Sequence, residues 1–323
     1  MQDLLNKQDF AELSQLVQAK VRSLNTFQLY YAETFLFLAR LSLFFLGYWI
    51  FSLGGLAARI LGIFVMAYAY TGIAITGTHE TSHLSYSKGK WSNKLWAFFF
   101  SDFWGAQSHL WWHYRHVQVH HLYPNVPNRE PKPFYFPWIN RYVYFFVVPY
   151  LIIFWLISYS IAYLRKQPMQ LALYLVVMLS GLAFHSWLFA RLGFSVGASI
   201  GLAFLMRSLF APLFMHIAVF NHIGLDNPEQ VLPWIPRQDN TTRNIKPTWF
   251  LRGMGGNAFL QSHLEHHLFP SLSNHTLTYV HEIVRDFLRQ KGYAYKEESY
   301  LSCLRNCIKH YHELFQNLPK ALW

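Results

Sequence analysis

The sequence predicts an all-α integral membrane protein with about four transmembrane helices and a cytosolic helical cap. Three observations lead to this fold class. Of the 323 residues, 53% are apolar and only 13% are charged, against about 25% charged in an average soluble domain. The apolar residues gather in long segments, and the net charge of +11 comes from basic residues that lie mostly outside those segments.

This composition excludes several classes of protein. Disordered chains and collagens lack such an apolar content, and the two cysteines, Cys303 and Cys307, are too few for a disulfide framework. Residues 1–33 form a polar, amphipathic segment without the basic start and cleavage site of a signal peptide. We therefore expect these residues to be an N-terminal cytosolic segment.

Five apolar segments are candidates to cross a membrane. A bilayer core about 30 Å thick needs roughly 20 apolar residues in a helix. The segments are 35–53, 56–76, 143–164, 170–190 and 195–220. Only Gly54 and Gly55 separate the first two, which predicts a tight helical hairpin. The aromatic stretch 94–112 is interrupted by Asp102 and Gln107, so we expect it to lie along the membrane interface.

Basic residues orient a membrane protein, because they remain on the cytosolic side. Seven of the 27 lysines and arginines lie between Thr78 and Arg141, and eleven lie beyond Asn221. Both regions are therefore expected in the cytosol, so the chain between them crosses the bilayer an even number of times. We expect segment 143–164 to lie at the interface. The four expected crossings are 35–53, 56–76, 170–190 and 195–220.

Nine of the 17 histidines lie in three clusters and at the exit of the last apolar segment, all in regions assigned to the cytosol. The clusters are His79-Glu-Thr-Ser-His83, His116-Val-Gln-Val-His120-His121 and His263-Leu-Glu-His266-His267, and the ninth histidine is His222. Residues three and four apart share one helix face about 5–6 Å apart, close enough to bind one metal ion. Imidazole suits Fe, Zn, Cu and Ni. Eight or nine imidazoles exceed the needs of one ion, so we expect two.

The three clusters resemble the histidine boxes of the membrane-bound fatty acid desaturases. The first box is His-x3-His, here 79–83, and the second is His-x2or3-His-His, here 116–121, followed by Leu-Tyr-Pro-Asn. The third box, 263–267, lies in a string that ends Glu-His-His-Leu-Phe-Pro, the most specific signal in the chain. Box order, spacing and the flanking hydrophobic hairpins match from about residue 35 to residue 275.

The resemblance implies an O2-dependent enzyme that desaturates fatty acyl chains with two iron ions held in the cytosolic cap. Breaking an unactivated C–H bond requires an oxidant that side chains do not supply, whereas a metal and O2 do. The ligands that the resemblance implies are His79, His83, His116, His120, His121, His222, His263, His266 and His267. We expect His109, His113, His185 and His216 to lie outside this set.

The resemblance and the boxes also point to residues that support the ligands. A ligating histidine usually donates its other N–H to a carboxylate or carbonyl. Glu80 and Glu265 lie inside the boxes and are the acceptors that we expect, with Asn257 as a further supporting residue. In animal acyl-CoA desaturases an asparagine four residues before the histidine that matches His222 reaches iron through water, and here that position is Ala218. Its candidate replacements are Asn221, Asn257 and His216.

The expected substrate is a long acyl chain on a lipid, on CoA or on acyl carrier protein. The chain has no heme-binding His-Pro-Gly-Gly signature, so electrons are expected from an external ferredoxin or cytochrome b5. The basic charge is expected to face membrane lipid, and no nucleic acid partner is expected. We expect a multi-pass protein of the bacterial inner membrane or endoplasmic reticulum, with its active site on the cytosolic side. The expected parts are an N-terminal amphipathic segment (1–33), a membrane desaturase domain (34–275) and a C-terminal helical segment (276–323).

Three other functions stay open. Acetylenases and hydroxylases share the boxes, and no residue excludes them. His79-Glu80-x-x-His83 is also the pattern of zinc metalloproteases, with two ligands and a glutamate base, although it leaves the other two clusters without a role. A non-catalytic metal-binding membrane protein would carry ionisable residues deep within several membrane helices, and few are present.

Overall fold

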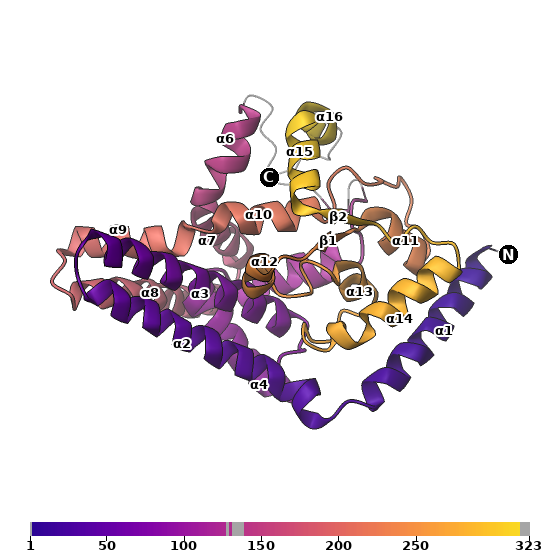
Figure 1. The fold of residues 1–323 in the computed structure, drawn as a ribbon, viewed down its shortest axis with the longest axis horizontal. Coiled ribbons are helices and arrows are strands. Elements are labelled where there is room, and N and C mark those ends of the chain that lie inside the picture. Colours follow the sequence, from indigo (N-terminus) through magenta and orange to yellow (C-terminus); the bar gives the residue numbers. More distant parts are fainter. Residues whose placement is uncertain (1, 127–128, 131–138, 317–323) are drawn as a thin grey trace. The chain divides into compact units, whose positions relative to one another are not determined.

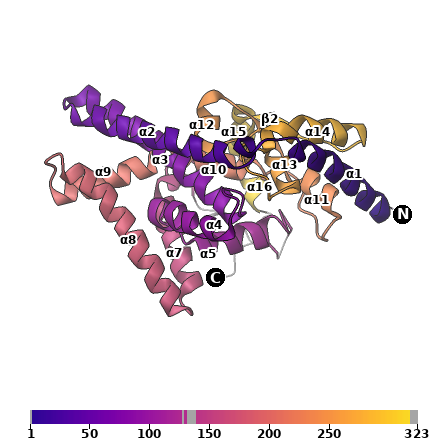
Figure 2. The same ribbon diagram turned by 90° about the horizontal axis from the view of Figure 1, so that it is seen from below.

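The computed structural model describes residues 2–126, 129–130 and 139–316, and the chain forms two compact units (Figures 1 and 2). The apolar unit contains residues 33–114 and 145–214. The histidine unit contains residues 1–32, 115–144 and 215–323. The described residues are mostly helical, which confirms the predicted class, and they add one small parallel sheet.

Among the described residues, four helices are long and apolar enough to cross a membrane, and each overlaps one of the four predicted crossings. Their bounds are Phe27–Ser52, Leu56–Ser82, Pro168–Ala190 and Val196–Phe220. The fifth apolar segment forms a 3-10 turn, Val148–Leu151, followed by the shorter helix α7, Ile152–Leu164. The prediction of four long apolar helices is therefore confirmed.

The first two of these helices form a tight hairpin. Helix α2 (Ala32–Ser52) and helix α3 (Leu56–Ser82) are joined by Gly54 and Gly55, whose φ angles of 79° and 74° lie in the left-handed region that glycine favours. Gly62 brings the two backbones together, because a Cβ atom there would lie 2.5 Å from the backbone nitrogen of Phe51. Small residues permit such close packing of membrane helices.

The aromatic stretch that follows α3 packs among the helices of the apolar unit. It contains α4 (Lys90–Ala97), the π-helix η2 (Phe98–Gly105) and α5 (His109–Trp112). Phe100, Asp102 and Trp104 of η2 are buried. These side chains of η2 therefore pack inside the apolar unit, and the position of the stretch along the membrane interface stays a prediction. Asp102 interrupts the apolar pattern because its carboxylate accepts the backbone N–H of His109 at 2.7 Å.

The remaining helices complete the apolar unit and lead into the histidine unit. They are α8 (Pro168–Ala190), α9 (Val196–Ser208) and α10 (Ala211–Phe220). Arg207 of α9 is buried, and its Nη1 lies 2.8 Å from Nδ1 of His185 in α8. The Arg207 guanidinium also lies over the Tyr70 ring, 5.0 Å from its centroid, so a cation inside the helix bundle has partners.

The histidine unit is built from short helices around one apolar core. Its elements are η1 (Phe27–Tyr31), α1 (Gln2–Arg22), η3 (His113–His120, which begins in the apolar unit), α6 (Arg141–Phe146), α11 (Trp234–Thr241), β1 (Asn244–Lys246), α12 (Trp249–Gly255), α13 (His263–Leu268), α14 (Leu277–Gln290), β2 (Glu297–Ser299), α15 (Tyr300–Lys309) and α16 (Tyr311–Gln316). Helix α1 lies along α14 (Figures 1 and 2). Leu13 of α1, Val280 of α14 and Leu264 of α13 belong to one buried cluster. The third box therefore sits on a helix that is anchored in this core.

The C-terminal segment contains several helices. Helix α14 ends at Gln290, and Gly292 follows with a φ of 82°. The chain then forms β2, which pairs in parallel with β1 in the register Asn244↔Glu297. Because β1 precedes the third box, this pairing ties the C-terminal segment to the region that holds the histidines.

We expect Gly181→Ala to destabilise the apolar unit. A Cβ atom at Gly181 of α8 would lie 1.8 Å from the backbone oxygen of Phe103 in η2, and crowding of this kind costs about 1–3 kcal/mol. Gly201→Ala in α9 is the matched control, because nothing lies within 4 Å of a Cβ atom there. Thermal unfolding in detergent should show a lower midpoint for Gly181→Ala alone. Equal midpoints for both variants would contradict the packing of η2 against α8.

Candidate metal centre

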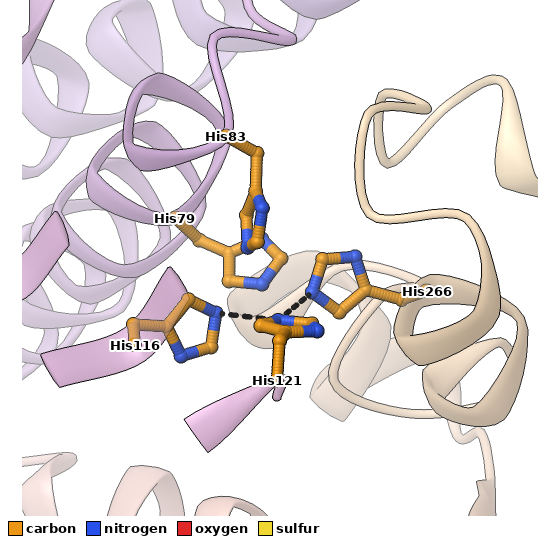
Figure 3. A group of neighbouring side chains, drawn as sticks. All are labelled: His79, His83, His116, His121 and His266. Carbon is orange, nitrogen blue, oxygen red and sulfur yellow. Dashed lines mark hydrogen bonds between the residues drawn. The ribbon is translucent and has the colours of Figure 1, made fainter. Parts of the chain in front are cut away.

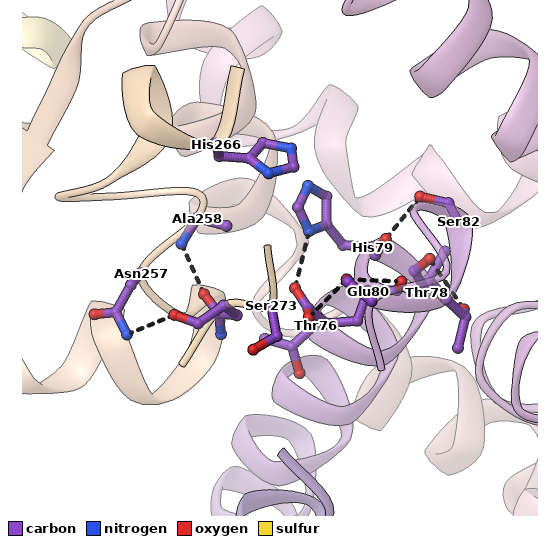
Figure 4. Close-up of polar contacts among 12 residues, drawn as sticks. Thr76, Thr78, His79, Glu80, Ser82, Asn257, Ala258, His266 and Ser273 are labelled. Carbon is purple, nitrogen blue, oxygen red and sulfur yellow. Dashed lines mark hydrogen bonds and ion pairs between the residues drawn. The ribbon is translucent and has the colours of Figure 1, made fainter. Parts of the chain in front are cut away.

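The first histidine box forms the last turn of α3. His79 and His83 are four residues apart, and their ring centroids lie 5.0 Å from each other, as a shared helix face requires. Nδ1 of His79 lies 3.6 Å from Oε1 of Glu80 (Figure 4). The Glu80 carboxylate also accepts a hydrogen bond from the Ser85 hydroxyl at 3.0 Å. Glu80 is therefore placed next to His79, where the sequence led us to expect an acceptor.

The second box lies on a π-helical turn and the residue that follows it. In π-helical geometry hydrogen bonds join residues five apart, and the N–H of His121 donates to the carbonyl of His116 at 3.1 Å. Nε2 of His121 consequently lies 3.2 Å from Nε2 of His116. The α-helical spacing expected from the sequence would instead have paired His116 with His120. The π-helical turn therefore places His120 with a different set of histidines, namely His222, His263 and His267.

The histidines of the third box also point to two different sides, as those of the second box do. Helix α13 is α-helical, so His263 and His267, four residues apart, point the same way, with ring centroids 4.7 Å apart. His266 points elsewhere and lies next to His121 of the second box, with its Nε2 3.0 Å from Nε2 of His121. All three histidines of this box are buried.

Two groups of histidines therefore form within the histidine unit. We call the first the tetrad, and its members are His120, His222, His263 and His267, whose ligand nitrogens all lie within 4.8 Å of one another. We call the second the triad, and its members His116, His121 and His266 meet the same distance limit. Figure 3 draws the triad together with His79 and His83 of the apolar unit.

The hydrogen bonds of the tetrad define which nitrogen of each ring carries the proton. Nδ1 of His222 lies 2.9 Å from the carbonyl oxygen of Thr241, and Nδ1 of His263 lies 2.6 Å from that of Ala258. Because a carbonyl only accepts hydrogen bonds, both rings carry their proton on Nδ1. Their Nε2 atoms face each other at 2.9 Å.

The other two tetrad rings follow the same rule. Nδ1 of His120 lies 2.5 Å from Oε1 of Glu130. Nδ1 of His267 lies 3.0 Å from Oε1 of Gln238, whose Nε2 is oriented by donating to the His121 carbonyl at 3.0 Å. All four rings thus donate outward through Nδ1, as metal-bound histidines do.

Four imidazole nitrogens converge in the tetrad within 4.8 Å of one another, as the ligands of one cation would. A proton is a poor candidate, because burial and then the neighbouring histidines hold the pKa of His267 well below its ordinary value. A metal ion suits the site, since neutral imidazole nitrogens are the ligands that Fe, Zn, Cu and Ni prefer. The residues present therefore fit a bound transition metal.

Two of the predicted supporting residues, Glu265 and Asn257, make different kinds of contact in the structure. Glu265 is fully buried and accepts from Asn244 at 3.0 Å, from the Tyr295 hydroxyl and from Nδ1 of His281 at 2.9 Å. These partners tie α13 to β1, to Tyr295 and to α14. Asn257 donates to the carbonyl of Asn274 at 3.3 Å (Figure 4), which holds the loop before the third box.

Sequence reasoning missed four of the acceptors that orient the tetrad. Thr241 and Ala258 act through backbone carbonyls, which any residue type supplies, so no sequence signal marks them. Gln238 lies on α11 and Glu130 follows the second box by nine residues. Of these four acceptors only Glu130 has a signal in the sequence, because it is an acidic residue soon after a histidine box.

The histidines expected outside the ligand set have partners of their own. Nδ1 of His109 lies 3.0 Å from Asp102, and Nδ1 of His113 lies 2.8 Å from the Ser82 carbonyl. Nδ1 of His216 lies 2.7 Å from the Tyr300 hydroxyl. Asn221, a candidate replacement for the family asparagine, donates to the carbonyl of Phe259 at 3.0 Å.

We expect the metal-free protein to lose stability as the pH falls below about 6.5. The folded protein keeps the pKa of His267 well below 6.5 through burial, whereas unfolding restores the ordinary pKa. Below about pH 6.5 the unfolded chain thus binds a proton that the folded chain does not, so acid favours unfolding, with a limiting slope of about 1.4 kcal/mol per pH unit for one group. Thermal unfolding of chelator-treated protein measures this. A midpoint that stays constant between about pH 8 and about pH 5 would contradict it.

Comparison with known proteins agrees with this geometry. Residues 54–299 match the family described as "Fatty acid desaturase". "Fatty acid desaturase 6" of Homo sapiens is 30% identical over 271 residues, which cover 80% of this chain and 74% of the relative. "Fatty acid desaturase 6" of Bos taurus is 29% identical, with 80% and 78% covered. "Fatty acid desaturase 3" of Homo sapiens is 25% identical, with 72% and 56% covered.

The family match extends over most of the chain and includes all three boxes. It contains three of the four long apolar helices and all nine histidines of the predicted ligand set. The chain belongs to the fatty acid desaturase family, a class of membrane di-iron oxidoreductases that act on fatty acyl substrates.

Proposed function

We propose that this protein is an O2-dependent desaturase that introduces a double bond into a fatty acyl chain with two iron ions. The observation that carries the proposal is the convergence of four imidazole nitrogens in the tetrad, a donor set that fits a transition-metal ion. The family assignment supplies the reaction class, because its members are membrane oxidoreductases.

The nine histidines would divide between two iron ions. The tetrad offers four nitrogens to one ion. The triad offers three to the other, and we propose that His79 and His83 complete that ligand set. Each ion then has four or five imidazole ligands, which is within the coordination number that iron accepts. The zinc-protease alternative would use the His79 and His83 pair and leave seven histidines unused, so we do not propose it.

The protein residues would hold the ligands in place and keep water away. Bound iron with O2 supplies the oxidising power for breaking an unactivated C–H bond. The carbonyls of Thr241 and Ala258, the amide of Gln238 and the carboxylate of Glu130 fix the four tetrad rings through Nδ1. Burial of the tetrad, three of whose members are almost inaccessible to solvent, limits side reactions with water.

The substrate would be a long acyl chain carried by a lipid, by CoA or by acyl carrier protein. Reduction of O2 to two water molecules takes four electrons, and removal of two hydrogens from the acyl chain supplies only two of them. We propose that a ferredoxin or cytochrome b5 type donor supplies the other two. The basic regions between Thr78 and Arg141 and beyond Asn221 support a cytosolic active site. The membrane would be the bacterial inner membrane or the endoplasmic reticulum.

We expect His263→Ala to abolish desaturation and to lower bound iron from two ions per chain to about one. The substitution removes one of four tetrad nitrogens and leaves His222 without its neighbour at 2.9 Å. His275→Ala is the matched control, because His275 bonds Tyr279 and is not in either histidine group. Iron analysis and product assay of the purified proteins measure both effects. Full iron with full activity in His263→Ala would overturn the ligand assignment.

Acyl analysis of cells that express the chain should show products that lack two hydrogens relative to their precursors. Cells that express a variant with all three histidines of the third box replaced by alanine should lack these products. Products that contain a carbon–carbon triple bond, or that gain one oxygen, would identify an acetylenase or a hydroxylase instead. Unchanged acyl profiles in both strains, with the protein present and loaded with iron, would contradict the proposed reaction on acyl chains of that host.

A further inference from the structure

The chain after the second box folds back onto the tetrad. Asn125 and Glu130 are buried, although both are polar. Asn125 adopts a φ of 57°, a left-handed conformation that asparagine tolerates better than most residues. This bend lets Glu130, ten residues after His120, approach that histidine.

The Glu130 carboxylate accepts two hydrogen bonds. Its Oε1 lies 2.5 Å from Nδ1 of His120, and its Oε2 accepts the backbone N–H of Asn125 at 2.9 Å. A carboxylate that accepts from a metal-bound histidine makes a charge-assisted bond, shorter and stronger than a neutral one. Both oxygens of the buried carboxylate are therefore used.

Asn125 connects this bond to a second tetrad ligand. Its Nδ2 donates to the backbone carbonyl of His222 at 2.8 Å, and it also lies 3.3 Å from the carbonyl of Asp226. His120 and His222 come from segments about 100 residues apart, and their ring centroids lie 4.5 Å from each other. The Asn125–Glu130 bridge thus holds two ligands from different boxes in one arrangement.

The acceptor of His120 differs in charge from the acceptors of the other tetrad rings. His222 and His263 donate to backbone carbonyls, and His267 donates to the amide of Gln238. Four neutral imidazoles leave the charge of a divalent ion uncompensated in a buried site, where charges interact strongly. Glu130 brings a negative charge to one side of that site.

We propose that Glu130 is a positioning residue that makes His120 the strongest donor of the tetrad and so tightens the hold of this site on its iron. The inference rests on the proposed function, because it requires the tetrad to bind iron. A carboxylate partner raises the basicity of the ring nitrogen that binds the metal, and loss of such a partner typically weakens metal binding about 10–100-fold. A neutral residue at position 130 would therefore weaken iron binding at the tetrad and leave iron binding at the other group unchanged.

Glu130→Gln tests the charge with little change in shape. The amide keeps one oxygen acceptor, but its NH2 group must then face either His120 Nδ1–H or the N–H of Asn125, which are both donors. Glu130→Asp keeps the charge on a shorter side chain. Glu229→Gln is the matched control, because Glu229 is an exposed carboxylate in the same unit.

The experiment is chelator competition on the full-length, iron-loaded protein, read as iron retained per chain. In Glu130→Gln we expect one of the two ions to leave at about 10–100-fold lower chelator concentration than in the parent, while the second ion stays. Glu130→Asp should recover most of the lost retention, and Glu229→Gln should match the parent. In His120→Ala, adding Glu130→Gln should have no further effect, which separates an action through His120 from a general loss of the fold.

Three results would overturn the inference, and each is distinct from failure of the proposed function. Unchanged iron retention in Glu130→Gln would show that the carboxylate does not tighten the site. Equal loss of both ions would indicate a structural role for Glu130. A further loss in the His120→Ala background would show that Glu130 acts by another route. If the parent protein itself binds no iron, the proposed metal centre fails, whatever the variant does.

Discussion

The hydrogen bonds that the four tetrad rings make outward through Nδ1 are the interaction on which the rest of this site depends. The outward hydrogen bonds from Nδ1 oblige each tetrad ring to present Nε2 inward as an acceptor, and two of these atoms lie only 2.9 Å apart. Four imidazole nitrogens that converge in this way form a donor set that fits a transition-metal ion. The carbonyls, the amide and the carboxylate that accept these hydrogen bonds hold the four rings in this arrangement.

Backbone geometry decides which histidines meet. A π-helical turn brings residues five apart to the same side and separates adjacent residues, so His121 joins His116 while His120 joins the tetrad. The α-helical turn of α13 makes the corresponding division, with His263 and His267 on one side and His266 on the other. The adjacent histidines of the second and third boxes can therefore serve two groups, which accounts for the His-His pair in each of these two boxes.

Much of the architecture could be predicted because it depends on local sequence. Apolar segment length predicted the four long helices, and the spacing of His79 and His83 predicted their shared helix face. The division of the second box could not be predicted, since the sequence does not distinguish a π-turn from an α-turn. The backbone acceptors at Thr241 and Ala258 depend on tertiary folding, and the burial of η2 depends on glycines such as Gly181 that admit its backbone.

X-ray absorption at the iron K edge of the purified protein tests the central claim most directly. The account predicts a first shell of nitrogen with the outer-shell scattering of several imidazole rings per iron, at two irons per chain. A first shell dominated by carboxylate oxygen or by sulfur, or a spectrum without imidazole scattering, would contradict it. Such a result would mean that the converging histidine nitrogens do not bind the iron.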